Sequence, residues 1–167
     1  IEWGDYLPDE SRNLMWGGKQ VSVDMQTYID MAARDISTLT GDSIPIWVTE
    51  IKLDPEWPAR LAEKKQIELF EAQSEVIVKT IVTLASNKAI EVVFYKDFLD
   101  YDRTRVIGQD IHSLVYLLNG SEPLGRFPVY SVDGNFLDQV RQYRFQRENA
   151  PDATFVWTDD TLIYGAP

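Results

Sequence analysis

The chain contains no cysteine, and its single histidine is His112. Without cysteine there is no disulfide, no thiolate nucleophile and no zinc site built on sulfur. His112 stands between apolar positions of a predicted helix, a setting more typical of a surface or packing residue than of a ligand. These absences leave the compartment open, although we favour an extracellular or cell-surface location.

Positive charge and long apolar runs are scarce as well. The 16 Lys and Arg residues are outnumbered by 27 Asp and Glu, which gives a net charge of -11. A surface of this sign repels phosphate, so we expect no nucleic-acid partner. The longest apolar run, residues 76–86, contains Lys79 and Thr80 and is shorter than the roughly 20 residues of a membrane-spanning helix. We expect no membrane span.

Signals for nucleotides and metals are weak. Gly17 and Gly18 lack the spacing of a phosphate-binding loop, and no Lys-Ser or Lys-Thr pair follows them. Asp97, Asp100 and Asp102 could bind Ca²⁺ through oxygen ligands. They lack the EF-hand pattern, however, and are more typical of a solvated acidic loop. We therefore expect no metal and no cofactor.

What the sequence does contain is enough apolar surface for a packed domain, since 44% of its 167 residues are hydrophobic. It begins with Ile and no signal sequence follows, so we expect residues upstream of it to be missing. Residues 1–6 have the character of the end of a strand, and residues 7–13 that of a loop. Apolar residues at helical spacing then predict a helix that Asp24 caps and Gly41 ends.

The central part of the chain alternates between strand and helix patterns. Residues 45–51 (PIWVTEI) form a short apolar run typical of a strand buried on both faces of a parallel sheet. A long helix is predicted over 59–86, a second buried strand over 89–95, and a helix that ends near Gly120. This order indicates parallel βαβ units, whose polar chemistry gathers at the carboxyl ends of the strands. From Phe127 onward, short β-like segments separated by turns predict antiparallel strands, namely FPVYSV, QVRQYRFQ, TFVWTDD and TLIYG.

Glu50 lies at the end of the first buried strand, where a parallel barrel would carry its active site. From the strand pattern alone, a solvated carboxylate, or one paired with Lys52 or Lys96, is as good an interpretation as a functional one.

Several segments, in order, resemble one large group of enzymes. PIWVTEI is similar to the seventh strand of the clan of (β/α)-barrel retaining glycoside hydrolases, in which an apolar strand closes in Thr-Glu. The helix with Gln73 and Glu75 before IVKTIVTLAS resembles the seventh helix, and VVFYKDFLDYD resembles the eighth strand. IHSLVYLLNGSEPLGR resembles the last barrel helix and its exit. VRQYRFQRENAPDATFVWTDD is similar to strands of the β-sandwich that often follows such barrels.

The resemblance implies an α/β fold in two parts. Residues 1–125 would form the C-terminal part of a TIM-type barrel, with strands six to eight and their helices, and residues 126–167 would be antiparallel β-sandwich strands. Glu50 would be the catalytic nucleophile that attacks the O-glycosyl bond of a polysaccharide or glycoside.

The resemblance also suggests residues that contact the substrate. Tyr6 would donate a hydrogen bond to the nucleophile, and Tyr95 would line a sugar subsite. Core or rim packing is an equally good interpretation of both tyrosines. Trp16 and Trp57, in predicted loops beside the strand ends, are either platforms for sugar stacking or ordinary lids on the barrel rim.

A retaining mechanism needs a second, protonated carboxyl about 5 Å from the nucleophile. In the family this acid/base lies on the fourth strand, which the sequence does not contain. Phe94 or Phe98 replaces the usual eighth-strand Trp, and no His stands beside Trp3 and Tyr6, where some family members carry one.

These departures keep open a non-catalytic, barrel-derived protein that binds glycans or serves as a structural subunit of a larger assembly. A different small α+β fold is the alternative if the predicted order of helices and strands is wrong. A half barrel leaves an open sheet edge and an uncovered face, so we expect the segment to need its missing half from the same or another chain.

Overall fold

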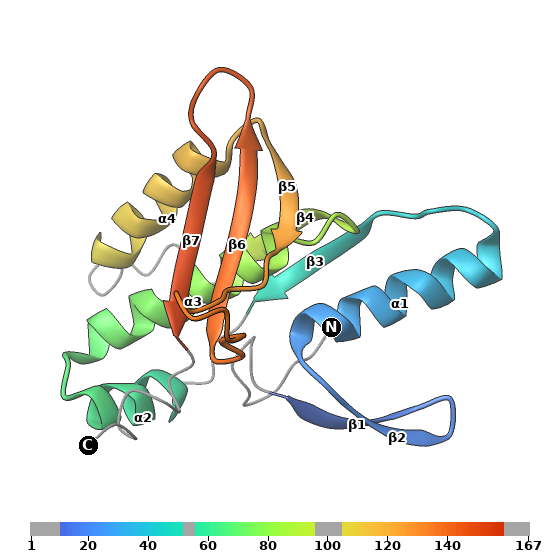
Figure 1. Cartoon of the computed structure of the whole chain (residues 1–167), viewed down its shortest axis with the longest axis horizontal. Coiled ribbons are helices and arrows are strands. Elements are labelled where there is room, and N and C mark those ends of the chain that lie inside the picture. Colours follow the sequence, from blue (N-terminus) through green and yellow to red (C-terminus); the bar gives the residue numbers. More distant parts are fainter. Residues whose placement is uncertain (1–10, 52–55, 96–104, 159–167) are drawn as a thin grey trace.

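A computed structural model describes residues 11–51, 56–95 and 105–158 of the chain. Within these ranges the protein is a mixed α/β structure with four helices and three small sheets (Figure 1). In chain order the elements are β1 (Arg12–Trp16), β2 (Lys19–Val23), α1 (Met25–Thr40), β3 (Ile46–Ile51), α2 (Glu56–Lys65), α3 (Leu69–Ala85), β4 (Ile90–Tyr95), α4 (Arg105–Leu118), β5 (Ser121–Arg126), β6 (Val140–Arg147) and β7 (Ala153–Thr158).

The first two strands form an antiparallel hairpin that the sequence interpretation missed. Arg12 pairs with Val23 at one end, and Trp16 pairs with Lys19 at the other. The two residues between the strands are Gly17 and Gly18, whose φ angles of 54° and 77° are both positive, as a two-residue type I′ turn requires. The prediction of a loop up to residue 13 is therefore wrong at its end, since residues 12 and 13 already belong to β1.

Helix α1 begins and ends where its local sequence predicts. The Asp24 carboxylate accepts a hydrogen bond from the Thr27 backbone N–H at 2.8 Å, which satisfies a donor of the first turn. At the other end Gly41 has φ 77° and its N–H donates to the Ser37 carbonyl. A left-handed residue at this position is favourable for glycine because it has no Cβ. The prediction of this helix is confirmed.

The predicted long helix over 59–86 is wrong, because it is two helices, α2 and α3. The chain turns at Gln66, whose φ is 54°, and α3 restarts after Glu68. The reason is tertiary packing, since the turn folds α2 back onto α3. Leu61 of α2 then packs against Ala72 and Val76 of α3 in a small apolar cluster.

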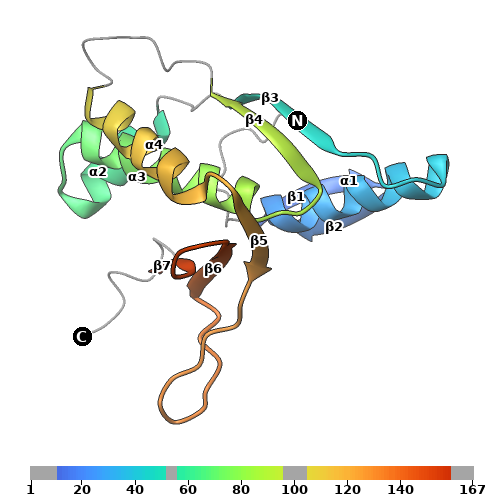
Figure 2. The same ribbon diagram turned by 90° about the horizontal axis from the view of Figure 1, so that it is seen from above.

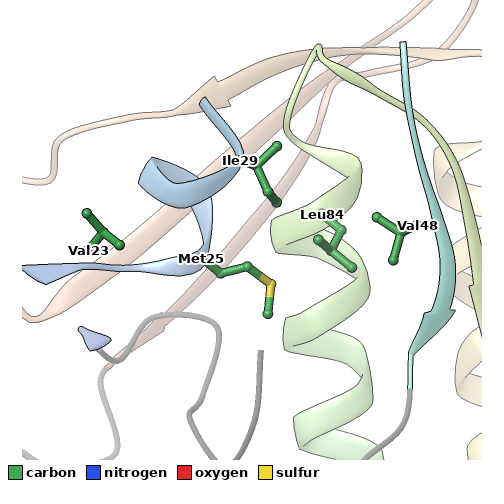
Figure 3. Packing of buried hydrophobic residues seen from close by; sticks show 5 residues of the cluster. All are labelled: Val23, Met25, Ile29, Val48 and Leu84. Carbon is green, nitrogen blue, oxygen red and sulfur yellow. The ribbon is translucent and has the colours of Figure 1, made fainter. Parts of the chain in front are cut away.

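Helix α3 is buried on nearly all sides and lies between the β3–β4 pair and the β5–β6–β7 sheet. One of its sides belongs to a core with α1, the β1–β2 hairpin, β3 and β4. Figure 3 shows the buried members of this core, in which Leu84 of α3 faces Ile29 of α1 and Val48 of β3. This packing fixes β3 against the helices, and with it the backbone that carries residue 50.

Another side of α3 packs against the C-terminal strands. Val82 forms a second core with Leu114 of α4 and with Tyr143 and Phe145 of β6. Because the helices contact strands on both of these sides, they form the middle layer between β3–β4 and β5–β6–β7 (Figure 2).

The prediction that the two apolar strands run parallel is confirmed. Strands β3 and β4 pair in parallel from Ile46↔Ile90 to Ile51↔Tyr95. The prediction that the strand is buried on both faces is wrong for the described residues. Val48 is only 5% exposed on the helix-covered face, whereas Trp47 is 59% exposed. In Figure 2 the β3–β4 pair lies at the outside of the helix layer.

The antiparallel character of the C-terminal strands is also confirmed. Strands β5, β6 and β7 form one antiparallel sheet. The predicted strand FPVYSV is wrong, because only Tyr130 in it makes an isolated bridge, to Phe136. The last predicted strand, TLIYG, lies outside the described residues.

The apolar face of this sheet packs on α3 and α4. Over the described ranges no second sheet covers the opposite face, so a β-sandwich stays a prediction. Strand β5 begins at Ser121, and the sheet therefore includes residues that we had expected to belong to the barrel part.

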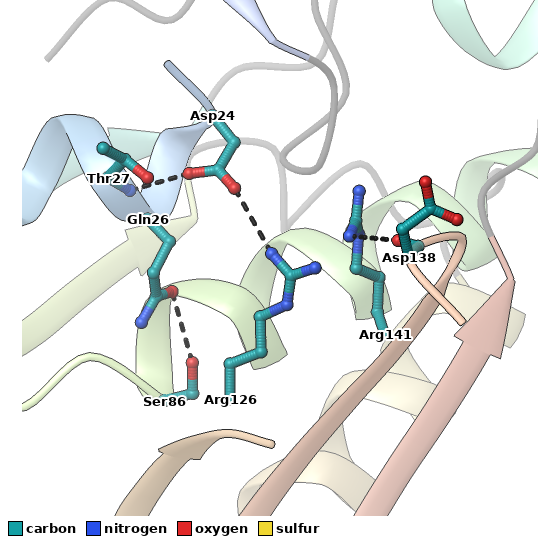
Figure 4. A network of polar contacts seen from close by, with 7 residues as sticks. All are labelled: Asp24, Gln26, Thr27, Ser86, Arg126, Asp138 and Arg141. Atoms are coloured by element: carbon teal, nitrogen blue, oxygen red, sulfur yellow. Dashed lines mark hydrogen bonds and ion pairs between the residues drawn. The ribbon is translucent and has the colours of Figure 1, made fainter. Parts of the chain in front are cut away.

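Polar contacts tie the layers together at one end of α3 (Figure 4). Arg126 of β5 approaches the second oxygen of the Asp24 carboxylate at 3.4 Å. The Ser86 hydroxyl donates to Gln26 at 3.4 Å. These contacts join β5 and the end of α3 to the start of α1.

Across the described ranges, three small sheets are present and no closed ring of strands is seen. A partial barrel therefore stays a prediction, as does the division at residues 125 and 126. None of the described helices combines the length and apolar character that crossing a membrane requires.

Candidate functional site

The candidate site is the edge where β3 and β4 end. Glu50 is the next-to-last residue of β3, and Ile51 pairs with Tyr95, the last residue of β4. Since the two strands are parallel, both carboxyl ends lie at the same edge of the sheet. The backbone therefore brings two of the predicted site residues, Glu50 and Tyr95, to one place.

The pairing of the two strands is irregular at this edge. Val48 pairs with Val93 and Ile51 pairs with Tyr95, so β3 has one more residue than β4 between the two pairs. An extra residue of this kind disrupts the alternation of side chains between the two faces. Strict alternation from Val48 would assign position 50 to the helix-covered face, and the irregularity removes that assignment. The structure describes the backbone of Glu50 but not its side chain.

The support beneath this edge is a packed core. Val48 lies two residues before Glu50 and contacts the same buried cluster as Leu84 and Ile29 (Figure 3). A side chain on a strand that is anchored in this way can be held more precisely than one on a loop. The fold thus anchors β3 in this core two residues before position 50.

The other end of the same strand pair carries a feature that the sequence interpretation missed. The indole N–H of Trp47 donates a hydrogen bond of 2.8 Å to a carboxylate oxygen of Glu91. Both side chains are exposed, and both lie in the first half of their strands. The sequence contained a signal for this position of Trp47. Successive side chains of a strand point to opposite faces, so Trp47 must point away from the face that Ile46 and Val48 share.

The two tryptophans predicted to lie in loops are placed differently. Trp16 is the last residue of β1, and its half-buried ring meets Tyr28 of α1 edge-on at a centroid distance of 5.5 Å. Trp57 belongs to helix α2. The prediction of loop positions is wrong for both, because the Gly-Gly turn makes a strand of the first and the helix starts earlier than expected around the second. Tyr6 lies outside the described residues.

Three charged side chains of the helical layer, those of Lys65, Glu75 and Lys79, are joined by ion pairs. Glu75 of α3 accepts from Lys79 of the same helix at 2.7 Å and from Lys65 of α2 at 2.5 Å. Ser74, one residue earlier, donates to Asp110 of α4. Lys79 is buried, and a buried charge needs such partners. The geometry fits a structural link between α2, α3 and α4.

The absence of a metal site stays a prediction, because the acidic segment near residue 100 is not described. In the three described ranges no group of three or more His, Asp or Glu residues is placed to hold a metal ion. His112 is exposed on α4. The acidic residues Asp97, Asp100 and Asp102 lie outside the described residues.

Comparison with known proteins gives no relative. The chain matches no protein-family model, no curated protein and no solved structure at a significant level. The structure itself defines the fold class, which is a mixed α/β structure with one parallel strand pair among the described strands. The resemblance to glycoside hydrolases remains a prediction.

Proposed function

We propose that the chain is part of a retaining glycoside hydrolase that cleaves O-glycosyl bonds of a polysaccharide or glycoside, with Glu50 as the nucleophile. The observation that supports this proposal is the parallel pairing of β3 and β4, which puts Glu50 and Tyr95 at one carboxyl edge. Catalytic residues of parallel barrels come from the carboxyl ends of several strands.

In the proposed reaction the ionised Glu50 carboxylate attacks the anomeric carbon, and the bond from that carbon to the leaving oxygen breaks. A second carboxyl protonates the leaving oxygen. The same second group, now ionised, then takes a proton from a water molecule, whose oxygen attacks the anomeric carbon and releases the Glu50 carboxylate. The second carboxyl has to come from a strand outside this sequence. Tyr6 would hold Glu50 in its charged state by a hydrogen bond, and Tyr95 would contact the sugar ring.

The two tryptophans are further proposed substrate contacts. Stacking on a sugar requires one exposed face of the indole ring. Trp16 is half-buried and its contact with Tyr28 is edge-on, so the contact alone does not occupy both faces.

The test uses the intact protein that contains this chain and a panel of nitrophenyl glycosides and neutral polysaccharides. Glu50→Gln keeps the shape of the side chain and removes its charge, so kcat should fall by at least about a thousandfold. Glu91→Gln is the matched control, because this exposed carboxylate lies at the opposite end of the same sheet. Equal turnover of Glu50→Gln and the parent protein would reject the proposal.

The second candidate function is a non-catalytic subunit that binds glycans or completes a larger assembly. It is favoured by the exposed face of β3–β4, where Trp47 is 59% exposed. Parallel sheets occur almost only with both faces covered. A native mass measurement on the 167-residue chain should then show association, whereas a stable, cooperatively melting monomer would contradict the need for a partner.

A further inference from the structure

The connection between β5 and β6 contains a small hairpin, residues 129–137, which we call the aromatic hairpin. Tyr130 and Phe136 face each other across it as an antiparallel bridge. The N–H of Leu137 donates to the carbonyl of Val129 at 2.8 Å. The hairpin lies in the connection between two strands of the C-terminal sheet and not at the edge that carries Glu50.

The turn of the hairpin is held by its own hydrogen bonds. The N–H of Ser131 donates to the carbonyl of Asn135 at 2.8 Å, and the N–H of Asn135 donates back to the Ser131 hydroxyl at 3.2 Å. Gly134 has φ 81°, a conformation that suits a tight hairpin turn. The side chains on this hairpin are therefore presented by an ordered backbone, and little ordering is left to do when a ligand binds.

One face of the aromatic hairpin is apolar and open. Tyr130 and Phe136 are opposite partners in the bridge, so their side chains lie on the same face, and the turn between them carries the exposed Val132. Tyr130 is 59% exposed and Phe136 is 55% exposed, and their rings contact each other with centroids 5.7 Å apart. In Figure 2 the connection that carries them extends away from the helices. Among the described residues nothing covers this face.

Charge and size decide between the occupants of such a face. The segment 127–140 contains no Lys or Arg and includes Asp133 and Asp138, so an anionic lipid surface would be repelled. A second copy of the chain would need a patch of about 20–30 residues for a stable interface. Three apolar side chains supply much less than that. They are enough for a small ligand that has one apolar face.

We propose that the aromatic hairpin is an ancillary binding site for a neutral glycan, separate from the catalytic edge. The apolar face of a pyranose ring would stack on Tyr130 or Phe136. The exposed polar groups of Asp133 and Asn135, on the same turn, would bind sugar hydroxyls. The choice of a sugar among ligands with an apolar face rests on the proposed function, while the location of the site rests on the hairpin.

The experiment is native affinity electrophoresis of the intact protein in gels that contain xylan, mixed-linkage β-glucan, galactomannan or starch. At least one of these polymers should retard the parent protein. Tyr130→Ala and Phe136→Ala each remove one stacking ring, so the affinity calculated from the retardation should fall between about twofold and tenfold. Tyr130→Phe keeps the ring and should retain binding. Tyr116→Ala is the matched control, because Tyr116 is a similarly exposed aromatic residue on α4.

The outcomes separate this inference from the proposed function. Weaker retardation in the two hairpin variants but not in Tyr116→Ala supports the glycan site, whatever turnover Glu50→Gln retains. Absence of retardation with all four polymers, or equal retardation of all variants, overturns it. A third outcome also overturns the inference. If no glycan binds and the native mass of Tyr130→Ala is lower than that of the parent protein, the patch is an interface with a second copy of the chain.

Discussion

The parallel strand pair and the antiparallel sheet lie on opposite sides of the same helices, and they differ in how their two faces are covered within the described chain. In the antiparallel sheet the alternating pattern matches its surroundings, since Tyr143 and Phe145 are buried against the helices and Arg144 between them is exposed. In the parallel pair Val48 is buried but Trp47, on the opposite face, is exposed. Antiparallel sheets tolerate one solvated face, whereas parallel sheets rarely do.

This difference lies in the outer faces of the two sheets, as far as the chain is described. The outer face of the antiparallel sheet carries polar residues such as Arg144 and Thr154, together with the exposed Val156. The parallel pair, which carries the candidate site, presents an aromatic residue outward and has strands on neither outer edge within the described residues. Within the described residues, the sheet at the candidate site therefore has two strands and one exposed face.

The largest expected effect tests whether the antiparallel sheet is anchored on the helices. Phe145 is 1% exposed and contacts Phe155 edge-on, so Phe145→Ala should lower the free energy of unfolding by about 3–5 kcal/mol in urea titrations of the intact protein. Val156→Ala, on the exposed face of β7, should change it by less than about 0.5 kcal/mol. A small effect of Phe145→Ala would mean that this sheet is not anchored on the helices.

The next effect tests the covered face of the parallel pair. Leu84 packs between Ile29 of α1 and Val48 of β3, and Leu84→Ala should cost about 2–5 kcal/mol by the same measurement. Leu39→Ala is the control, since Leu39 is exposed near the end of α1. If both changes had the same small effect, β3 would not be anchored on the helices, and the packing argument for the candidate site would fail.

A smaller effect is expected at the start of α1. Asp24→Ala removes the helix cap and should cost about 1 kcal/mol. Asp24→Asn keeps a good capping residue and removes only the charge that faces Arg126, so its cost should be within about 0.5 kcal/mol. Equal losses in thermal melts of the two variants would show that the ion pair, rather than the cap, is the main contribution.

The smallest effect is expected on the open face. Most of the Trp47 indole is in solvent, so Trp47→Ala in the 167-residue chain should cost less than about 1 kcal/mol in urea titrations. A loss of about 3–5 kcal/mol, as for a buried aromatic residue, would show that this face is already covered and would remove the contrast between the two sheets.

The sequence predicted those parts of the fold whose signals are local. Asp24 and Gly41 mark the ends of α1 through their own backbone preferences, and the structure confirms both. The alternation of strands and helices predicted the parallel pairing of β3 and β4. The Gly17-Gly18 turn was an equally local signal for the β1–β2 hairpin and was overlooked.

Other features depend on tertiary packing and had no such signal. The break between α2 and α3 occurs at Gln66, a residue with no preference for a positive φ. An unbroken apolar strand also does not reveal whether one or both of its faces are covered, which is why the exposure of Trp47 was not expected. At the candidate site, the shared edge of Glu50 and Tyr95 was predictable, but the irregular pairing after Val48 was not.

The most direct test of the central claim is covalent trapping of the nucleophile. A 2-deoxy-2-fluoro glycoside with a good leaving group slows the reaction because fluorine destabilises the oxocarbenium-like transition state, so that the glycosyl ester accumulates. Peptide mass mapping of the inactivated intact protein should find one added glycosyl group, located on Glu50. A label on another carboxylate, or complete inactivation without a label on Glu50, would contradict the account.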